Sequence, residues 1–476
     1  MTKKVAFYTL GCKANQYDTE SMKEAIRDEP GCQVVPFSGD EDPDAVVVNT
    51  CSVTNGADRK SRKYVRRAAR KGDLVMVTGC YTTLDSDDVA EISGVDVIFT
   101  NLHKNGIVDI LNRAESGFRG KVESSTGKNG NLDNQVISKD SSHTRAFLKI
   151  QDGCSNSCTF CKVQFLRGPA RSKSPSRIME EAGKLGDHGF RELVLTGINL
   201  AEYGGEEYGL AELIRKLSRL EKISRIRLSS INPDGITREL LEAFKNSEKT
   251  CPYFHVPLQS GSNRILEKMN RGYTREFYLK KINLIKQYLS DPTIGTDLMV
   301  GFPGEEETDF ARTKETVRKA EYINGHVFRY SPRDATPASD FEERVNSSTK
   351  KRRADELRSL LTSVSLSYRR GFENSGREMI IEEPSDKIDG WRGYSRNYLN
   401  IHLSSANQSG DLEPGETVEA KVVDVKEGFC LAKPLNYDRE LWKEDRKKLT
   451  RDKKKAGSDK NRRERDHRER ANPEGP

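Results

Sequence analysis

The chain has 476 residues, a net charge of +7 and nine cysteines, and it is too long for one ordinary domain, so we expect two to four. The N-terminal apolar stretch is too short for a signal peptide, and no run has the length of a membrane span. These features exclude a membrane protein and indicate a cytoplasmic one, in which cysteines are more often metal ligands than disulfides. Most of the net positive charge comes from the tail after residue 435.

Three apolar runs near the N-terminus each end on a cysteine, at Cys12, Cys51 and Cys80. The runs at 5–10, 45–50 and 74–78 have the continuous apolar character of buried parallel strands, and helices at 16–28 and 58–71 separate them. Since parallel strands end at one edge of a sheet, the three cysteines should converge there. Three thiolates favour an iron–sulfur cluster with an open iron, and the alternative is three buried structural cysteines. Cys32, Cys251 and Cys430 lack this pattern and are interpreted as structural.

The second predicted helix, 58–71, carries many basic residues and few acids. Such a run is usually a solvated face, but here it makes phosphate binding plausible, with Arg62, Arg66 and Arg67 as candidates. A stretch rich in Gly, Asn and Ser follows at 124–142 and indicates a linker after a first domain at 1–123.

The segment Cys154–Cys161 has the spacing C-x₃-C-x₂-C. Three thiolates at this spacing can hold a [4Fe–4S] cluster and leave the fourth iron open to a small molecule. Zinc is the alternative, but structural zinc normally takes four Cys or His ligands, and the next cysteine is Cys251.

From residue 143 to 368, strand-like runs alternate with helical stretches. The runs are 146–150, 192–196, 225–228, 253–257, 293–300 and 325–330, which predicts a partial (β/α)6 barrel, open on one side. Polar residues at the carboxyl ends of these runs are candidates for cofactor binding, although each turn alone could be an ordinary βα turn. The candidates are Gly197, Asn199, Ser229, Ser230, Gln259 and Asp297.

After residue 368, short runs at 378–382, 394–403 and 417–425 are separated by turn signals and predict a small antiparallel β-barrel over 369–434. Arg392, Tyr394 and Arg396 mix cations with an aromatic ring, as single-stranded RNA recognition requires, although they could equally form a solvated face. We expect the charged tail, 435–476, to be disordered.

The cysteine motif resembles that of the radical S-adenosylmethionine (SAM) superfamily, and two sites of three cysteines in this order resemble its methylthiotransferase branch. The match covers nearly the whole chain and includes four longer stretches: 11–15, 49–54, 255–262 and 301–305. The resemblance implies a multidomain α/β fold in which Cys154, Cys158 and Cys161 hold the SAM-cleaving [4Fe–4S] cluster and Cys12, Cys51 and Cys80 hold an auxiliary one. It also implies a C-terminal TRAM domain, a tRNA substrate, and an electron donor such as flavodoxin or ferredoxin.

Three branches of that family share this layout. The stretch at 9–20, with Lys13 after Cys12, is similar to the bacterial branch that inserts a methylthio group at C2 of N6-threonylcarbamoyladenosine 37, next to the tRNA anticodon. The alternatives are the N6-isopentenyladenosine branch, the branch acting on an aspartate of a ribosomal protein, and a non-catalytic RNA-binding iron–sulfur protein.

Overall fold

The computed structural model describes residues 2–39, 42–122, 131–138, 144–205, 208–404 and 412–435. It divides the chain into two compact units, Met1–Tyr368 and Arg369–Pro476. Across the described ranges, the helices are all too short or too polar to cross a membrane. The domain boundaries inside the first unit remain predictions, and the predicted tail lies beyond the described residues except for Leu435.

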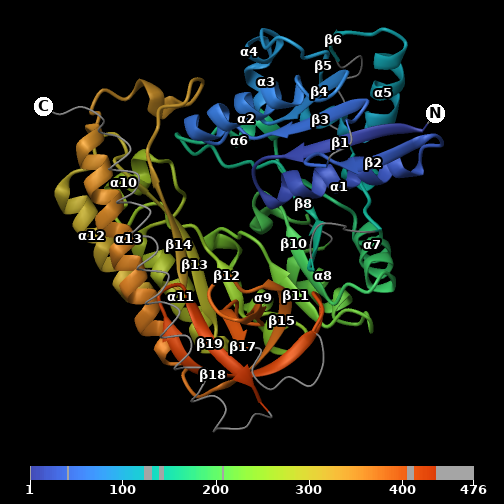
Figure 1. Ribbon diagram of the computed structural model, residues 1–476. Coiled ribbons are helices and arrows are strands. Elements are labelled where there is room, and N and C mark those ends of the chain that lie inside the picture. The colour runs from blue at the N-terminus through green and yellow to red at the C-terminus, as the bar shows by residue number, and fades with distance from the viewer. Residues whose placement is uncertain are drawn as a thin grey trace, which may run out of the picture. The chain divides into compact units, whose positions relative to one another are not determined.

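The first unit begins with a six-stranded parallel sheet in the order β2-β1-β3-β4-β5-β6 (Figure 1). Its middle strands are fully buried because both faces are covered, which is why their sequences are continuously apolar. This confirms the predicted parallel-sheet domain. The strands are β1 (Lys3–Thr9), β2 (Cys32–Pro36), β3 (Ala45–Thr50), β4 (Leu74–Gly79), β5 (Val97–Ile98) and β6 (Gly120–Lys121).

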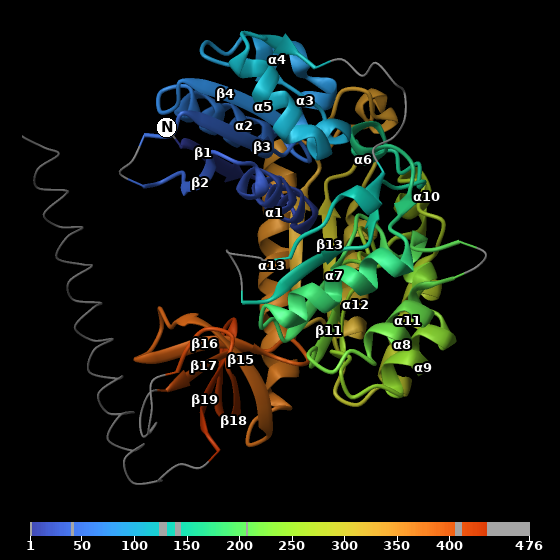
Figure 2. The same cartoon turned by 90° about the vertical axis from the view of Figure 1, so that its right-hand side faces the viewer.

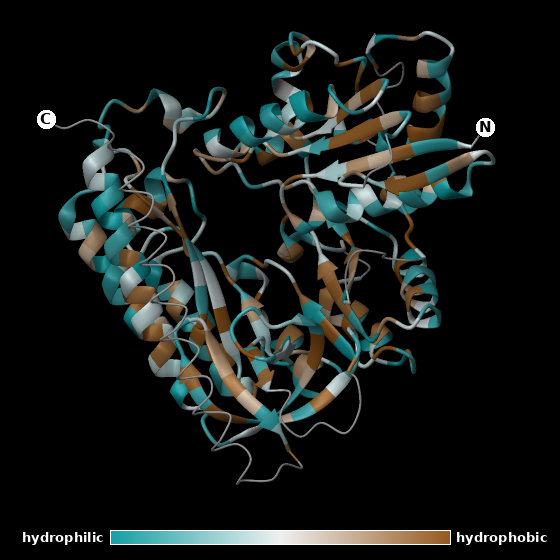
Figure 3. Cartoon of the chain, in the orientation of Figure 1, coloured by the Kyte–Doolittle hydropathy of each residue, from teal (hydrophilic) through white to brown (hydrophobic). Residues whose placement is uncertain are grey.

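Helices cover this sheet on both sides. On one face, α1 (Lys13–Asp28) and α5 (Ile107–Glu115) bury Met22, Ile26 and Ile110 against alternate residues of the strands. On the other face, α2 (Asn55–Ala68), α3 (Tyr81–Leu84) and α4 (Ser86–Ala90) bury Val65 and Val89 against the remaining residues. Figure 3 shows the apolar strands between more polar helices. Helix α2 starts before the predicted residue 58. The Thr54 hydroxyl accepts a hydrogen bond from the Ala57 amide and so caps the N-terminus of the helix.

Six parallel strands follow, in the order β7-β10-β11-β12-β13-β14. Two three-stranded sheets, β7-β10-β11 and β12-β13-β14, are joined by isolated parallel bridges between β11 and its neighbour. In the described part of the chain no bridge joins β7 to β14, so the barrel is open there, which confirms the predicted partial barrel. The strands are β7 (Ala146–Lys149), β10 (Glu192–Thr196), β11 (Arg225–Leu228), β12 (Tyr253–His255), β13 (Thr293–Val300) and β14 (Asn324–Arg329).

The helices of this region pack on the outside of the strands and share one apolar core with them (Figure 2). They are α7 (Pro175–Asp187), α8 (Leu210–Leu217), α9 (Arg238–Lys245), α11 (Arg275–Tyr288), α12 (Glu307–Ala320) and α13 (Ser347–Arg370). There are also two short helices: α6 (Val163–Arg167) precedes α7 in sequence, and α10 (Asn263–Lys268) lies between α9 and α11. Since helices cover the outward faces of the strands, the inward faces are left for polar residues.

Part of the predicted linker is well packed. Ile137 is fully buried in the barrel core, and the Gln135 carbonyl accepts hydrogen bonds from Tyr17 and Lys173. The segment 131–138 therefore contributes to the contact between the first domain and the barrel.

The second unit is a closed five-stranded barrel in the order β15-β16-β17-β19-β18. The predicted barrel is present, but β17 and β19 pair in parallel where an entirely antiparallel barrel was expected, because five strands in a closed ring cannot alternate in direction throughout. The run predicted at 394–403 is also divided by a turn in which Tyr398 has φ of 65°. The strands are β15 (Gly376–Pro384), β16 (Gly390–Ser395), β17 (Asn400–Ser404), β18 (Thr417–Lys426) and β19 (Phe429–Pro434).

Candidate functional site: two groups of three cysteines

Cys12, Cys51 and Cys80 follow β1, β3 and β4 and lie together at the carboxyl edge of the first sheet. A Cβ atom placed on Gly11 would lie 3.1 Å from Cys51 Sγ, and the Cys80 amide donates to the Thr50 carbonyl at 3.0 Å. The pKa of Cys51 is raised to about 12, chiefly by burial and also by the nearby Cys80 and Cys12. The structure therefore brings together the three thiols that the sequence places far apart.

Two glycines make this convergence possible. Gly11 and Gly79 precede Cys12 and Cys80 and have φ of 106° and 104°, in the region that side chains disfavour. A Cβ atom on Gly79 would lie 2.3 Å from the Thr50 carbonyl oxygen, so the two strand ends could not approach with any larger residue.

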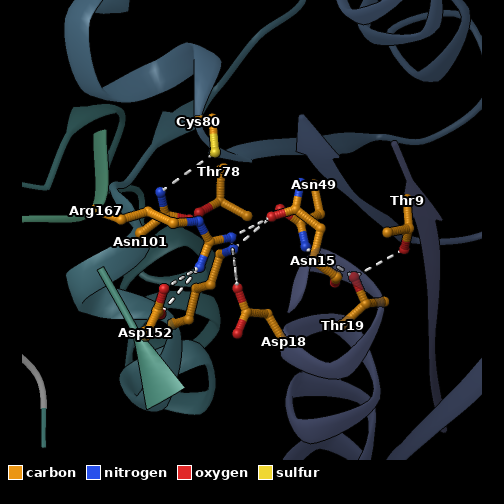
Figure 4. Close-up of polar contacts among 12 residues, drawn as sticks. Thr9, Asn15, Asp18, Thr19, Asn49, Thr78, Cys80, Asn101, Asp152 and Arg167 are labelled. Carbon is orange, nitrogen blue, oxygen red and sulfur yellow. Dashed lines mark hydrogen bonds and ion pairs between the residues drawn. The ribbon is translucent and has the colours of Figure 1, made fainter. Parts of the chain in front are cut away.

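A buried polar network lies beside these cysteines and is centred on Arg167, at the end of α6 (Figure 4). Its guanidinium donates two hydrogen bonds to Asp152, at 2.8 and 2.9 Å, and further ones to Asn15 and Asp18 of α1. The Arg167 guanidinium thus joins the first domain to the barrel. Its pKa is raised although burial opposes this, because Asp152, Cys80, Asp18 and Cys12 all lie close to it.

The network contains a second buried carboxylate, that of Asp18, which is paired with several cations. Burial alone would raise the pKa of Asp18, but Lys104, Lys149 and Arg167 hold it well below its usual range. Lys104 donates to Asp18 at 2.8 Å and to Asn49 at 3.1 Å. Buried carboxylates and cations of this kind are stable only when each is paired, so the network fixes how the strand ends meet the barrel.

The second group, Cys154, Cys158 and Cys161, lies in the loop between β8 (Gln151–Asp152) and α6. The pKa of Cys154 is raised to about 12, chiefly by burial and then by Glu202 and Cys161. That of Cys161 is raised to about 11 by burial and by Cys158. Cys158 Sγ accepts a hydrogen bond from Arg271 Nη1 at 3.3 Å, and Cys154 Sγ donates to Glu202 at 3.4 Å.

Arg271 and Glu202 are site residues that the sequence analysis did not identify. Arg271 also donates to Asn232 at 2.9 Å and to Tyr273 at 3.1 Å, and it is more than 100 residues from the cysteine it contacts. Glu202 accepts from the Ser155 amide and from Asn199, both at 2.8 Å. The only available signal for Glu202 was its place after β10, where the other polar candidates also lie.

Gly197, Asn199 and Ser229 are predicted cofactor residues that follow the carboxyl ends of β10 and β11. Gly197 lies in the turn after β10. The side-chain oxygen of Gln151 accepts hydrogen bonds from the next two backbone amides, those of Ile198 and Asn199, at 2.9 and 3.0 Å. Asn199 accepts from the Ala201 and Asn232 amides, at 3.2 and 3.3 Å. Ser229 and Thr196 each have a buried hydroxyl without a partner among the described residues.

The remaining three candidates are Ser230, Gln259 and Asp297. Ser230 bridges to His255, and its carbonyl accepts the Leu200 amide at 3.3 Å. Gln259 has φ of 66° and bridges to β13 through its backbone. Asp297 lies within hydrogen-bonding distance of His255 and His326. It is part of β13 itself, whereas the other candidates lie in the turns that follow strands.

The residues present fit the groups that the cysteine patterns imply. A thiol must lose its proton to bind iron, and burial, which raises the pKa of Cys51, Cys154 and Cys161, favours the protonated form of these three in the absence of a cation. Arg167 and Arg271 lie where they would offset the negative charge of a thiolate-bound cluster. The unpartnered hydroxyls of Ser229 and Thr196 offer hydrogen bonds to a polar ligand such as SAM.

The basic helix α2 presents its candidates in two ways. Arg66 and Arg67 are exposed, and Arg67 lies 5.4 Å from the centre of the Phe37 ring. Arg62 is half-buried and donates to Tyr81 at 2.8 Å, in a cavity of about 360 Å³ that Lys162 and Arg333 also line. Only the first two therefore present a guanidinium on the open surface.

In the second unit, Arg392 donates to Tyr394 at 2.8 Å and pairs with Glu383 at 2.6 Å. Arg396 pairs with Glu378 at 3.0 Å. The Tyr394 ring stacks on Tyr398 with 4.6 Å between centroids and 17° between planes. These residues lie together on the barrel.

Comparison with known proteins agrees with both cysteine groups. Residues 148–317 match the Radical SAM superfamily, and residues 4–100 match a family described as uncharacterized protein family UPF0004. The chain is 35% identical to threonylcarbamoyladenosine tRNA methylthiotransferase MtaB of Bacillus subtilis, over 83% of this chain and 89% of that protein. It is 37% identical to MtaB of Aquifex aeolicus, over 86% and 98%. It is also 34% identical to tRNA-2-methylthio-N(6)-dimethylallyladenosine synthase of Pelotomaculum thermopropionicum, over 84% and 90%.

Among solved structures, the fold is similar to the radical SAM methyltransferase TsrM of Kitasatospora setae, with a TM-score of 0.55 and 13% identity, over 71% of this chain and 77% of that one. At this identity the likeness concerns the fold alone. The identities to the curated relatives extend over most of their length and include both cysteine-bearing domains. The chain therefore belongs to the radical SAM methylthiotransferase family and is a tRNA-modifying enzyme of that kind.

Proposed function

We propose that this enzyme adds a methylthio group to C2 of N6-threonylcarbamoyladenosine 37, next to the anticodon of tRNA. The observation that carries the proposal is the presence in the first unit of two groups of three thiols that the fold brings together, Cys12, Cys51 and Cys80 in one and Cys154, Cys158 and Cys161 in the other. The choice of substrate rests on the relatives with this printed activity, at 35–37% identity, and on the Lys13 that follows Cys12. A dimethylallyladenosine enzyme at 34% identity makes that substrate the second candidate.

Cys154, Cys158 and Cys161 would hold one [4Fe–4S] cluster together with SAM, and Cys12, Cys51 and Cys80 would hold a second cluster. The bound groups supply a 5′-deoxyadenosyl radical at the first site and a methylated sulfur at the second. Glu202 offers a carboxylate beside Cys154, suited to the ammonium group of an amino acid. Arg271 and Arg167 place positive charge beside the two groups of thiols.

The tRNA would be bound through phosphate contacts and base stacking. Arg66 and Arg67 on α2 present guanidinium groups for phosphate, and the Tyr394–Tyr398 stack presents an aromatic surface for a base. We propose a cytoplasmic location, where tRNA and a reducing partner such as flavodoxin or ferredoxin are present.

The reaction is tested with reconstituted enzyme and an anticodon stem-loop RNA that carries threonylcarbamoyladenosine or dimethylallyladenosine. We expect the methylthio nucleoside to appear by mass spectrometry with the first RNA only. The Cys12→Ala variant should still form 5′-deoxyadenosine from SAM, but it should give no methylthio product.

Cys32→Ala is the matched control, since Cys32 lies on β2 and outside both groups. It should retain the full reaction. Methylthiolation by the Cys12→Ala variant would contradict the assignment of the second cluster, and methylthiolation of only the dimethylallyl RNA would contradict the assigned substrate.

A further inference from the structure

A line of polar side chains crosses three adjacent strands of the barrel at β12, β13 and β14. His255 Nε2 lies 3.0 Å from one carboxylate oxygen of Asp297, and His326 Nδ1 lies 3.0 Å from the other. On the far side of His255, Tyr253 Oη lies 3.4 Å from Nδ1 and donates to Asn324 at 3.2 Å. Five residues from three strands thus form one continuous polar array.

The strand register shows that this array faces inward. Asp297 of β13 pairs with His326 of β14 and lies on the same face. Ile294 and Leu298 lie on the opposite face of β13 and point into the core shared with the outer helices. Gly295 lies between the array members, and a Cβ atom there would approach Asn324, Tyr253 and His255 to 2.3, 2.4 and 3.0 Å. The array can form only because this position has no side chain.

The array ends on a side chain that is available to a ligand. The His326 side chain is 70% exposed, compared with 13% for His255 and 25% for Asp297. The hydrogen bond that occupies Asp297 uses Nδ1 of His326, so Nε2 lies on the other side of the ring. Two residues further along β14, Phe328 is 41% exposed, with its ring centre 6.2 Å from that of His326.

The charge near His326 is positive. The hydrogen bond to Asp297 raises the pKa of His326, and the Lys13 ammonium lies close enough to oppose that rise. Both oxygens of Asp297 already accept from histidines, so its charge is balanced within the array. The Asp297–His326 pair therefore faces the interior, and the Lys13 ammonium, which directly follows Cys12 in sequence, lies near enough to act on it.

We propose that this array binds the N6 substituent of the target adenosine, with His326 and Lys13 contacting its carboxylate and Phe328 flanking the base. This inference rests on the proposed function and adds a specificity site to it. The threonylcarbamoyl group has a carboxylate, a hydroxyl and carbamoyl N–H groups, which can pair with the array. A dimethylallyl group has none of them and would remove water from the array without replacing its hydrogen bonds.

The position of Lys13 links this site to the reaction. Lys13 directly follows Cys12 and lies 5.9 Å from the centre of the Phe147 ring of β7, so it reaches from the first domain to the barrel. Lys13 is thus next to a thiol of the first group in sequence and near enough to His326 to oppose the rise in its pKa, so the substituent would be held between Lys13 and His326.

The test compares two RNA stem-loops, one with threonylcarbamoyladenosine and one in which the threonine carboxylate is converted to a carboxamide. For the unaltered enzyme we expect KM to be about tenfold lower for the carboxylate, since hydrogen bonds to charged groups contribute at least this much. For His326→Phe, KM for the carboxylate should rise about tenfold and the preference should disappear. Iron content and visible absorption check that the variant holds its clusters.

The matched control is His188→Phe, an exposed histidine at the C-terminal end of α7, which should keep the preference. If His326→Phe keeps the preference of the unaltered enzyme, the inference is wrong while the proposed function stands. If the unaltered enzyme modifies only dimethylallyl RNA, both are wrong. A metal other than iron that is present in equimolar amount and lost in Asp297→Asn would overturn the inference by assigning these residues to a metal site.

Discussion

At the scale of single residues, the two arginines beside the thiols have different roles. Arg271 contacts a thiol directly, with Nη1 3.3 Å from Cys158 Sγ. Arg167 lies near Cys12 and Cys80, but its guanidinium donates its hydrogen bonds to Asp152, Asn15 and Asp18. The first should therefore act mainly on the cluster and the second mainly on the junction between domains.

Replacing Arg271 by Met should make the cluster held by Cys154, Cys158 and Cys161 harder to reduce, because a positive charge beside a thiolate is lost. Removal of such supporting contacts typically lowers activity about 10- to 100-fold. An electron paramagnetic resonance titration should give a more negative reduction potential, and 5′-deoxyadenosine formation should fall. Arg275→Met, which removes an arginine that pairs with Glu315 on the outer helices, is the control. An unchanged potential in Arg271→Met would show that the contact has no electrostatic role.

Replacing Arg167 by Ala should destabilise the first unit by about 3–5 kcal/mol, because Asp152 and Asp18 would remain buried without this partner. Denaturant unfolding of the purified protein measures this. The control Arg215→Ala breaks an exposed pair with Glu239 and should cost at most about 1 kcal/mol. Equal losses for the two variants would contradict the account of the buried network.

At the scale of elements, the ends of strands carry the chemistry and the helices hold the strands in place. The thiols of the first domain follow β1, β3 and β4, while the polar candidates of the barrel follow β10 and β11 or lie on β12, β13 and β14. The thiols and the candidates after β10 and β11 agree with the rule that ligands bind at the carboxyl ends of parallel strands, whereas Asp297 and His326 lie within β13 and β14, on the inner face of the barrel. In the second unit the candidate binding residues do not follow the ends of parallel strands. The stacked rings of Tyr394 and Tyr398 lie on β16 and in the turn after it, on a closed barrel.

The Tyr394–Tyr398 stack gives a prediction for that barrel. Tyr394→Leu should weaken binding of single-stranded RNA to the full chain by about 1–3 kcal/mol, since one stacked base contact is lost. Fluorescence anisotropy with a labelled oligonucleotide measures this at fixed salt. Phe277→Leu, which removes an exposed ring from α11, should leave the affinity unchanged. Equal affinity for the Tyr394→Leu variant and the unaltered protein would remove the barrel from the RNA-binding surface.

At the scale of the whole molecule, β1, β3 and β4 could be predicted because burial leaves a continuous apolar run in the sequence, whereas the partly exposed β2 and the two-residue strands β5 and β6 left no such run. The convergence of Cys12, Cys51 and Cys80 could be expected from topology alone, since parallel strands end at one edge. Short-range patterns do not report contacts between distant segments. For that reason Arg271, Arg167 and the position of His326 beside Asp297 became visible only in the structure. Strand β19 (Phe429–Pro434) was also absent from the predicted runs.

The central claim is that this enzyme modifies threonylcarbamoyladenosine in tRNA. The most direct measurement is mass spectrometry of tRNA nucleosides from cells with and without the gene. We predict that 2-methylthio-N6-threonylcarbamoyladenosine disappears without the gene and that N6-threonylcarbamoyladenosine accumulates in its place. Loss of the dimethylallyl derivative instead, or no change in any tRNA nucleoside, would contradict the claim.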